Sequence, residues 1–468
     1  MSLTRPRHHP LLTLAISLAL FMEAVDTTIL NTAIPAMAHS LKVSPIDLKI
    51  ALISYLLSLA MFIPISGWMA DKFGLKRVFI LALTVFTLSS IWCGFAHNLI
   101  QLVLARSLQG LGGSLTMPLG RLLIVRTFAR HELITTMNRI VMVAALGLML
   151  GPVLGGFITH YLSWHWIFWV NAPVGVLTLL LAYRVFPCTP SIPVPRLDKV
   201  GFILFGCGLA GFTFGLSALS ETNVPPWVAI ATLLISSLLF MGYIWHSTGQ
   251  PHPVVNTRLF SFRTFQISVL GNLLARLGFG GVPFLLPLLF QIGLGLSAQV
   301  SGLLMAPAAF GVLLVKPLSL PALRLVGYKR LFVSNTFFVG LSLWSFMTIN
   351  ANTSLLHIGC LTFIFGFLIS LQYSAINSLA YADISSNELS AATSIISTLQ
   401  QIAQSFGVAV SALLVRLFAL TAHGEMILSV TVMDDAFFSM GILTFLSIFT
   451  FLKLGQEDGY QLIKPQES

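Results

Sequence analysis

The chain has 468 residues, of which 56% are hydrophobic and only 9% are charged. An ordinary soluble protein carries roughly 25% charged residues, so this composition excludes a soluble globular domain and indicates an all-α polytopic membrane protein. The net charge of +10 would suggest nucleic-acid binding in a soluble protein, but the basic residues collect in loops, where they set orientation, and no nucleic-acid partner is expected.

Apolar runs of about 20 residues recur along the chain and predict fourteen transmembrane helices. An even number of spans places both termini on one side of the membrane. Basic residues gather in alternate loops, and the positive-inside rule makes that side cytoplasmic. We therefore expect a multi-pass protein of the cell (inner) membrane with both termini cytoplasmic. The helices are predicted to begin near residues 11, 47, 78, 99, 134, 165, 198, 226, 263, 299, 330, 354, 393 and 433.

The predicted helices group as six, two and six. Residues 1–187 form an N-terminal six-helix bundle, 188–262 two linker transmembrane helices, and 263–468 a C-terminal six-helix bundle with a short cytoplasmic tail. Polar, proline-containing stretches mark both seams. The turn Asp71–Arg77 after the second helix is echoed by Leu325–Arg330 after the tenth. Related halves are typical of alternating-access carriers, which bind substrate between the halves.

Two carboxylates interrupt the first apolar helix. An acid at the centre of a spanning helix costs about 2.5–3.5 kcal/mol on insertion scales, so such groups usually face a bundle interior or a wet cavity. Glu23 and Asp26 are three residues apart and therefore lie on one helical face. This pair predicts a site that handles a proton, or a proton and a substrate, in a membrane carrier.

The turn after the second helix supplies the gating candidates. Gly74 permits a tight turn, and Asp71 is placed to cap a helix or to pair with an arginine that latches the inward face. The alternative is a basic loop that only sets topology. The full set of gating candidates is Gly67, Asp71, Gly74, Lys76 and Arg77.

The fourth and fifth helices carry two further patterns. Arg106, Gln109 and Met117 recur on one face of the fourth helix together with glycines. A buried arginine there needs an anionic partner or water, and a satisfied structural cation is the alternative. In the fifth helix, small residues at every fourth position permit close helix packing, and a proline bends the helix. These residues are Gly147, Gly151, Pro152, Gly155 and Gly156.

In this order the segments resemble the signature motifs of the major facilitator superfamily, over nearly the whole chain. The motifs are Gly67–Arg77, Arg106–Gly113 and Gly147–Gly156, the last associated with antiporters. With Asp26–Pro35, Trp164–Gly175 and fourteen helices, the chain is similar to EmrB/QacA-type drug:proton antiporters and, among them, to MdtD-like multidrug exporters. The resemblance implies a major facilitator fold, two six-helix bundles plus two extra central helices.

The resemblance also implies a proton-coupling set: Asp26 and Arg106 as partners, with Glu23 beside them. Protonation of Asp26 would then be coupled to substrate binding or to the inward–outward switch. Glu23 departs from the pattern, because a neutral residue is expected there in many relatives. It is interpreted as either a second proton site or a substrate contact one turn nearer the cytoplasm.

Polar residues inside predicted spans are candidates for a substrate cavity. Arg276 lies mid-span in a half that offers no intramembrane acid, and Lys316 lies in the cytoplasmic third of its helix. Contact with an anionic substrate group and contact with backbone carbonyls both stay open for these two cations. For Arg121, snorkelling to the cytoplasmic surface is the favoured interpretation. The candidates are Arg276, Lys316, Gln109, Met117, Arg121, Gln291, Gln372 and Gln400.

The sequence lacks the motifs that other classes of function require. Without a phosphate-binding loop the energy source is expected to be a proton gradient, with no cofactor. No catalytic set lies at membrane depth, so the chain is not expected to be an enzyme, and its four scattered cysteines argue against a metal site. We expect a monomer whose partners are membrane lipid, protons and a small-molecule substrate. The substrate is a drug-like compound exported from the cytoplasm or, alternatively, a small anionic metabolite such as a carboxylate or siderophore.

Overall fold

The computed structural model describes residues 9–128, 130–187, 194–219, 224–384, 388–423 and 427–459. Within these ranges the chain consists of helices joined by turns, without a strand. It divides into two compact units, Met1–Asp198 and Lys199–Ser468, called unit 1 and unit 2 below. The predicted division at residues 188 and 262 stays a prediction.

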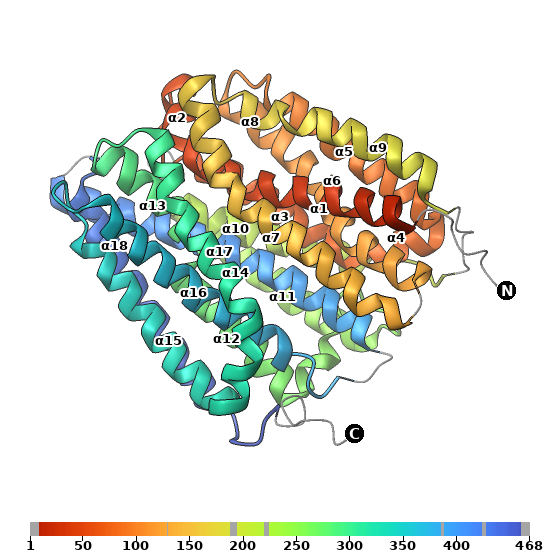
Figure 1. The fold of residues 1–468 in the computed structure, drawn as a ribbon. Helices are drawn as coiled ribbons and strands as arrows, with labels where there is room; N and C mark the ends of the chain where they lie inside the picture. The colour runs from red at the N-terminus through yellow and green to blue at the C-terminus, as the bar shows by residue number, and fades with distance from the viewer. Residues whose placement is uncertain are drawn as a thin grey trace. The chain divides into compact units, whose positions relative to one another are not determined.

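Unit 1 contains the helices of the first half (Figure 1). A proline shapes one of its spans, because a proline removes a backbone donor and so favours a tighter 3₁₀ turn or a break. Pro64 lies in such a turn, between α3 and α4. The elements are α1 His9–Ile29, η1 Leu30–Ala33, α2 Ile34–Leu41, α3 Lys49–Phe62, η2 Ile63–Ile65, α4 Ser66–Phe73, α5 Leu75–Cys93, α6 Leu99–Thr127, α7 Arg130–Tyr161, α8 Trp166–Trp169 and α9 Asn171–Val185.

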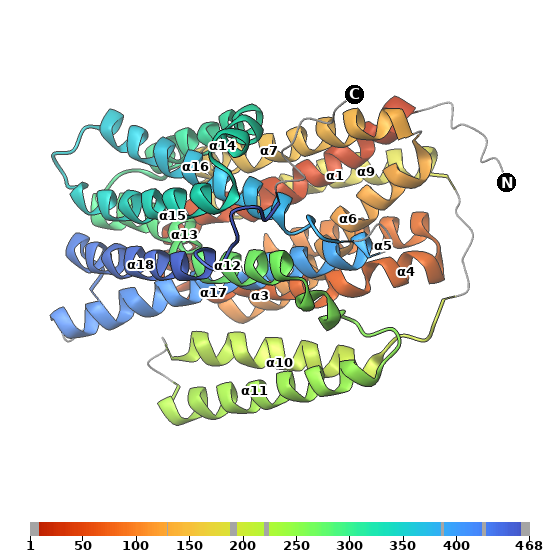
Figure 2. The same cartoon turned by 90° about the horizontal axis from the view of Figure 1, so that it is seen from below.

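Unit 2 begins with a helical hairpin. Figure 2 shows α10 and α11 running side by side, and Phe212 of α10 packs on Phe406 of α17 with ring centroids 5.2 Å apart. The elements are α10 Lys199–Ala218, α11 Pro226–Gly249, η3 Thr257–Ser261, α12 Arg263–Phe279, α13 Val282–Leu288, the π-helical turn η4 Leu289–Gly293, α14 Ala298–Val326, α15 Tyr328–Ser345, η5 Phe346–Thr348, α16 Leu355–Leu379, α17 Leu389–His423 and α18 Val430–Phe451.

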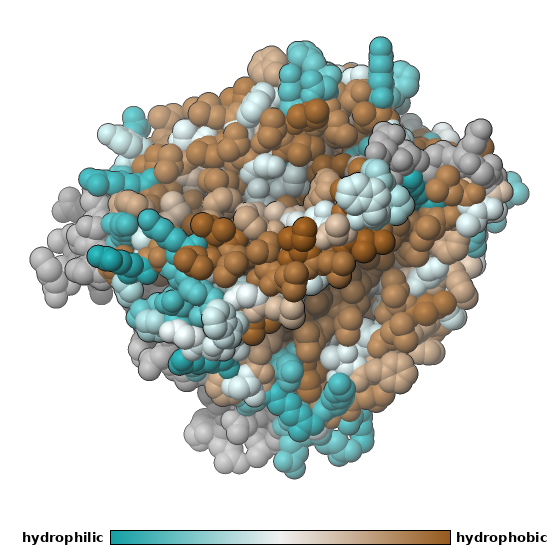
Figure 3. All heavy atoms as spheres, turned by 180° about the vertical axis from the view of Figure 1, so that it is seen from behind, coloured by the Kyte–Doolittle hydropathy of each residue, from teal (hydrophilic) through white to brown (hydrophobic). Residues whose placement is uncertain are grey.

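Thirteen segments of the described chain are long and apolar enough to cross a membrane. The remaining predicted span corresponds to α6, which is 29 residues long but is made more polar by Arg106, Gln109 and Arg121. Apolar side chains cover much of the face shown in Figure 3, as expected for helices in contact with lipid. The prediction of an all-α polytopic membrane protein is therefore confirmed.

Helix α1 packs against the glycine motif of α7 (Figure 1). A Cβ atom on Gly151 would lie 1.9 Å from Thr28 Oγ1, and one on Gly155 would lie 2.3 Å from the backbone oxygen of Ile29. The Thr32 hydroxyl donates to the Pro152 carbonyl at 3.3 Å, across the same contact. Since α1 carries both membrane acids, this close contact fixes where those acids lie.

We predict that Gly155→Ala lowers the melting temperature of the purified protein in detergent, because the new methyl group meets backbone that cannot rotate away. Overpacking of this kind typically costs about 1–3 kcal/mol. The matched control is Gly67→Ala, since a Cβ on Gly67 meets nothing within 4 Å. Equal melting temperatures for the two variants would contradict the assignment of the motif to helix packing.

Candidate functional site

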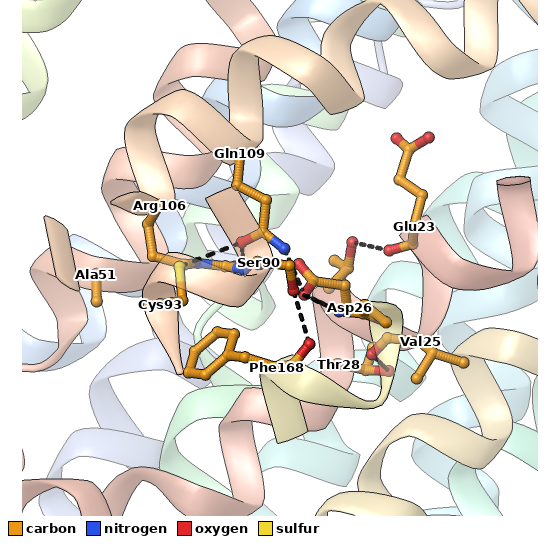
Figure 4. A network of polar contacts seen from close by, with 12 residues as sticks. Glu23, Val25, Asp26, Thr28, Ala51, Ser90, Cys93, Arg106, Gln109 and Phe168 are labelled. Atoms are coloured by element: carbon orange, nitrogen blue, oxygen red, sulfur yellow. Dashed lines mark hydrogen bonds and ion pairs between the residues drawn. The ribbon is translucent and has the colours of Figure 1, made fainter. Parts of the chain in front are cut away.

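A buried carboxylate lies at the centre of unit 1. Asp26 of α1 is fully buried. Its Oδ2 accepts from Arg106 Nη1 at 2.6 Å, and its Oδ1 accepts from Gln109 Nε2 at 2.8 Å and from Asn171 Nδ2 at 2.9 Å. The ion pair implied by the family resemblance is therefore present in the structure, with two amide donors around it. Figure 4 shows Arg106 and Gln109 converging on Asp26.

The guanidinium group of Arg106 is held on several sides. Its Nη1 also donates to Gln109 Oε1 at 2.7 Å, and its central carbon lies 4.1 Å from the centroid of the Tyr55 ring. The Nε and Nη2 atoms are buried without a hydrogen-bond partner in the described chain. Two nitrogen atoms of Arg106 are therefore still able to donate hydrogen bonds beside the ion pair.

Several helices of unit 1 meet at this site, and residues on each of them account for the contact. Arg106 and Gln109 are one turn apart on α6, and a Cβ on Gly110 would lie 2.5 Å from the Tyr55 carbonyl, so glycine is needed for α6 to approach α3. Asn171 opens α9 and also donates to Ser90 Oγ of α5 at 3.0 Å. The carboxylate of α1 thus links α6 and α9, and Asn171 extends the network to α5.

Glu23 differs from Asp26 although it is less than one turn away. It is only 7% exposed, and its Oε2 is buried without a hydrogen-bond partner in the described chain. Figure 4 shows its carboxylate pointing away from the Asp26 network. Arg121 acts on it electrostatically, but the Arg121 Nη2 atom instead contacts Met117 Sδ at 3.5 Å. The first helix therefore holds one paired acid and one unpaired acid.

The turn between α4 and α5 is tied to two other helices. Asp71 Oδ1 accepts from Arg126 Nη2 at 2.6 Å, at the end of α6. Lys76 Nζ donates to the Tyr183 carbonyl at 2.6 Å, near the end of α9. Gly74 has φ of +88°, a conformation that favours glycine. Of the remaining gating candidates, Arg77 is exposed and Gly67 meets no steric constraint.

Neutral groups surround the guanidinium group of Arg276 in unit 2. Its Nε donates to Asn272 Oδ1 at 3.2 Å, and its Nη1 donates to Gln404 Oε1 at 3.2 Å and to the Gln400 carbonyl at 3.3 Å. The guanidinium carbon lies 4.1 Å from the centroid of the Tyr373 ring. No carboxylate contacts Arg276 in the part of the chain that the structure describes.

The other cavity candidates lie in different settings. Lys316 is exposed on α14, and Gln291 of η4 donates to Ser301 Oγ at 3.3 Å. Gln372 is fully buried between α15 and α16, where it donates to Thr336 at 3.0 Å and accepts from Asn335 at 2.9 Å. Gln400 donates to Asn377 at 2.6 Å. The structure thus places Gln372 in a packed helix contact, and Gln109 in the Asp26 network.

Sequence reasoning missed three side chains that complete these two clusters: Asn171, Tyr55 and Tyr373. It named Gln109 as a cavity candidate but not as a donor to Asp26. Asn171 lies inside the aromatic segment Trp164–Gly175, which contributed only to the family resemblance. A polar residue at the first position of an apolar helix was the available signal. Its spacing from Asp26 along the chain gave no indication of contact.

Comparison with known proteins places these features in context. The family model described as Major Facilitator Superfamily matches residues 16–408. The "Probable transport protein HsrA" of Haemophilus influenzae is 35% identical over 452 residues, covering 96% of each chain. The "Putative multidrug resistance protein MdtD" of Yersinia enterocolitica is 34% identical over 423 residues, covering 90% of this chain and 89% of the relative.

Solved structures agree in fold. The POT family transporter PepTSo has a TM-score of 0.70 at 15% identity, and the match covers 99% of this chain and 100% of that chain. A D-xylose–proton symporter has a TM-score of 0.66 at 16% identity and covers 96% of this chain and 98% of its own. At such low identity these similarities concern the fold alone.

We predict that Asn171→Ala lowers the melting temperature of the purified protein, because a buried carboxylate loses one of its donors. A lost partner of a buried charged group costs about 1–3 kcal/mol or more. The control is Asn352→Ala, at an exposed position in the turn before α16. If the two variants melt together, the Asn171 contact carries no stability.

Proposed function

Because the chain belongs to the major facilitator superfamily, we propose that it is a proton-coupled antiporter that exports drug-like compounds from the cytoplasm by alternating access. The observation that carries the proposal is the buried Asp26–Arg106 ion pair at 2.6 Å. Relatives named as multidrug resistance proteins support the substrate class. In this proposal the protein lies in the inner membrane as a monomer with both termini cytoplasmic, and the proton gradient replaces any cofactor.

The ion pair supplies a means of coupling. When Asp26 is ionised, it accepts from α6 and α9 at once and holds both helices against α1. When a proton binds Asp26, the charge is lost and the bond from Arg106 weakens, because a charge-assisted bond is about twice as strong as a neutral one. Gln109 already accepts from Arg106 and can keep it bound. Protonation therefore favours a second arrangement of α1, which is the requirement for a proton-driven switch.

Glu23 gives the same helix a second acid with a different task. Its buried Oε2 atom has no hydrogen-bond partner in the part of the chain that the structure describes, and it lies in surroundings where a charge is costly. In the proposal Glu23 accepts either a proton or the cationic group of a substrate, and either event removes the cost of the lone charge. The latch between Asp71 and Arg126 then acts at one end of the spans, where it holds α4 to α6 in one state of the cycle.

A second candidate function is export of a small anionic metabolite. The observation that favours it is Arg276, a nearly buried cation whose contacts in the described chain are all neutral. A guanidinium group binds carboxylates in a bidentate manner, so an anionic substrate would complete its coordination. Lys316 is exposed on α14 of the same unit and adds positive charge there.

We predict that Asp26→Asn abolishes coupled transport, because asparagine cannot be protonated and keeps no charge for Arg106. The measurement is dye accumulation in everted membrane vesicles, together with the collapse of the proton gradient when substrate is added. Asp435→Asn, at an exposed position of α18, is the control. The amount of protein in the membrane is measured for both variants. Retained coupling in Asp26→Asn would overturn the proposal.

A further prediction separates the two candidate substrates. Arg276→Ala should reduce export of an anionic compound at least tenfold while changing export of a cationic dye less than twofold, since the guanidinium charge attracts only the anion. The matched control is Arg139→Ala, which removes an exposed arginine from α7. An equal loss for anion and cation would remove Arg276 from substrate binding and leave it as part of the packing of α12.

A further inference from the structure

A groove on unit 2 lies outside the sites described so far. It has a volume of about 770 Å³ and is bounded by the end of α14, the start of α15 and the end of α18. Figure 1 shows α15 and α18 running side by side. The groove, called the α15 groove below, is lined at one end by Arg324, Lys329 and Arg330 and along its wall by Phe337, Phe338 and Leu452.

The basic end of the α15 groove carries three uncompensated charges. Arg324 and Arg330 are exposed, Lys329 is partly buried, and none of the three side chains has a hydrogen-bond or ion-pair partner among the described residues. The acids nearest in sequence to the lining are Glu457, which is exposed and forms no ion pair with the three cations, and Asp458, whose Oδ2 accepts from the Gly455 amide at 2.7 Å. This end of the groove therefore attracts anions.

The equivalent turn of unit 1 shows what is different here. Gly74 and Gly327 both have positive φ, +88° and +77°, and each separates two helices. Three residues before the glycine, unit 1 has Asp71, which is paired with Arg126. Unit 2 has Arg324 at that position. The same backbone turn thus makes an internal latch in unit 1 and a surface of unpaired cations in unit 2.

The wall of the groove is apolar and follows the helix away from the charges. Phe337 is 46% exposed and Phe338 is 53% exposed, although both lie on a helix that spans the membrane. From Arg330 to Phe338 the helix rises about 12 Å, at about 1.5 Å per residue. Positive charge at the membrane surface followed by an apolar wall of this length matches a phosphate headgroup and the first part of its acyl chains.

From this geometry we propose that the α15 groove binds an anionic phospholipid. The phosphate contacts Arg324, Lys329 and Arg330, and the acyl chains lie against Phe337, Phe338 and Leu452. A free inorganic anion would leave the apolar wall unfilled, and a zwitterionic lipid would leave the three cations uncompensated. Basic pockets between transmembrane helices bind anionic lipid headgroups in other membrane proteins.

The test uses the purified full-length chain. It is delipidated in detergent and titrated with phosphatidylglycerol, and retained lipid is counted by native mass spectrometry. We expect Arg324→Gln/Lys329→Gln/Arg330→Gln to lose one tightly retained lipid, with affinity lower by about tenfold or more. The matched control is Arg184→Gln/Arg196→Gln/Lys199→Gln, which removes two arginines and one lysine from exposed positions elsewhere.

Two further arms distinguish the possible outcomes. Phe337→Ala/Phe338→Ala, which leaves all three cations in place, should also weaken phosphatidylglycerol retention, so the result does not depend on one variant folding. Phosphatidylcholine should show no difference between the groove and control variants. Equal lipid loss in both triple variants would show general charge attraction and overturn the proposal. So would inorganic phosphate raising the melting temperature as much as phosphatidylglycerol does, since the acyl chains would then have no role.

Discussion

The buried ion pair between Asp26 and Arg106 is the interaction on which unit 1 depends. Moving a charged group out of water costs several kcal/mol per ion even after relaxation, and attraction between the partners offsets that cost only when their remaining hydrogen-bonding capacity is also used. Both Asp26 oxygens accept hydrogen bonds from α6, and one of them also accepts from α9. A pair this short requires the helices to approach closely. The glycines of α6 and α7 therefore support the ion pair indirectly, because they allow the helices to approach closely.

The two units treat a membrane arginine in different ways. Arg106 and Arg276 each lie 4.1 Å from the ring centroid of a tyrosine, Tyr55 and Tyr373 respectively. Arg106 has a carboxylate partner, whereas Arg276 is surrounded by amide and carbonyl oxygens. Neutral oxygens solvate a guanidinium group but leave its charge in place. Among the described residues a carboxylate therefore balances the charge of Arg106, whereas no carboxylate contacts Arg276, and the buried Oε2 atom of Glu23 on α1 has no hydrogen-bonding partner.

Sequence was sufficient wherever the signal was local. Length and hydropathy located the helices, and Gly155 was recognised as a packing position because small residues recur at a spacing that only a helix places on one face. It was insufficient where function depends on which side chains meet across helices. Asn171 and Asp26 are 145 residues apart, and no pattern links them. Gln372 is a polar residue inside a predicted span and so qualified as a cavity candidate. In the structure, hydrogen bonds to Asn335 and Thr336 of α15 hold it in the contact between α15 and α16.

The turn glycines show how one constraint permits different functions. A backbone with φ near +80° strongly favours glycine, so Gly74 and Gly327 are determined by the path of the chain. The side chains around each glycine are under no such restriction. In unit 1 they carry an acid that reaches Arg126, and the turn becomes a link between α4 and α6. In unit 2 the corresponding position is Arg324, which has no partner within the described chain and lies beside an exposed apolar wall. Backbone geometry thus accounts for the echo between the halves, and charge accounts for their divergence.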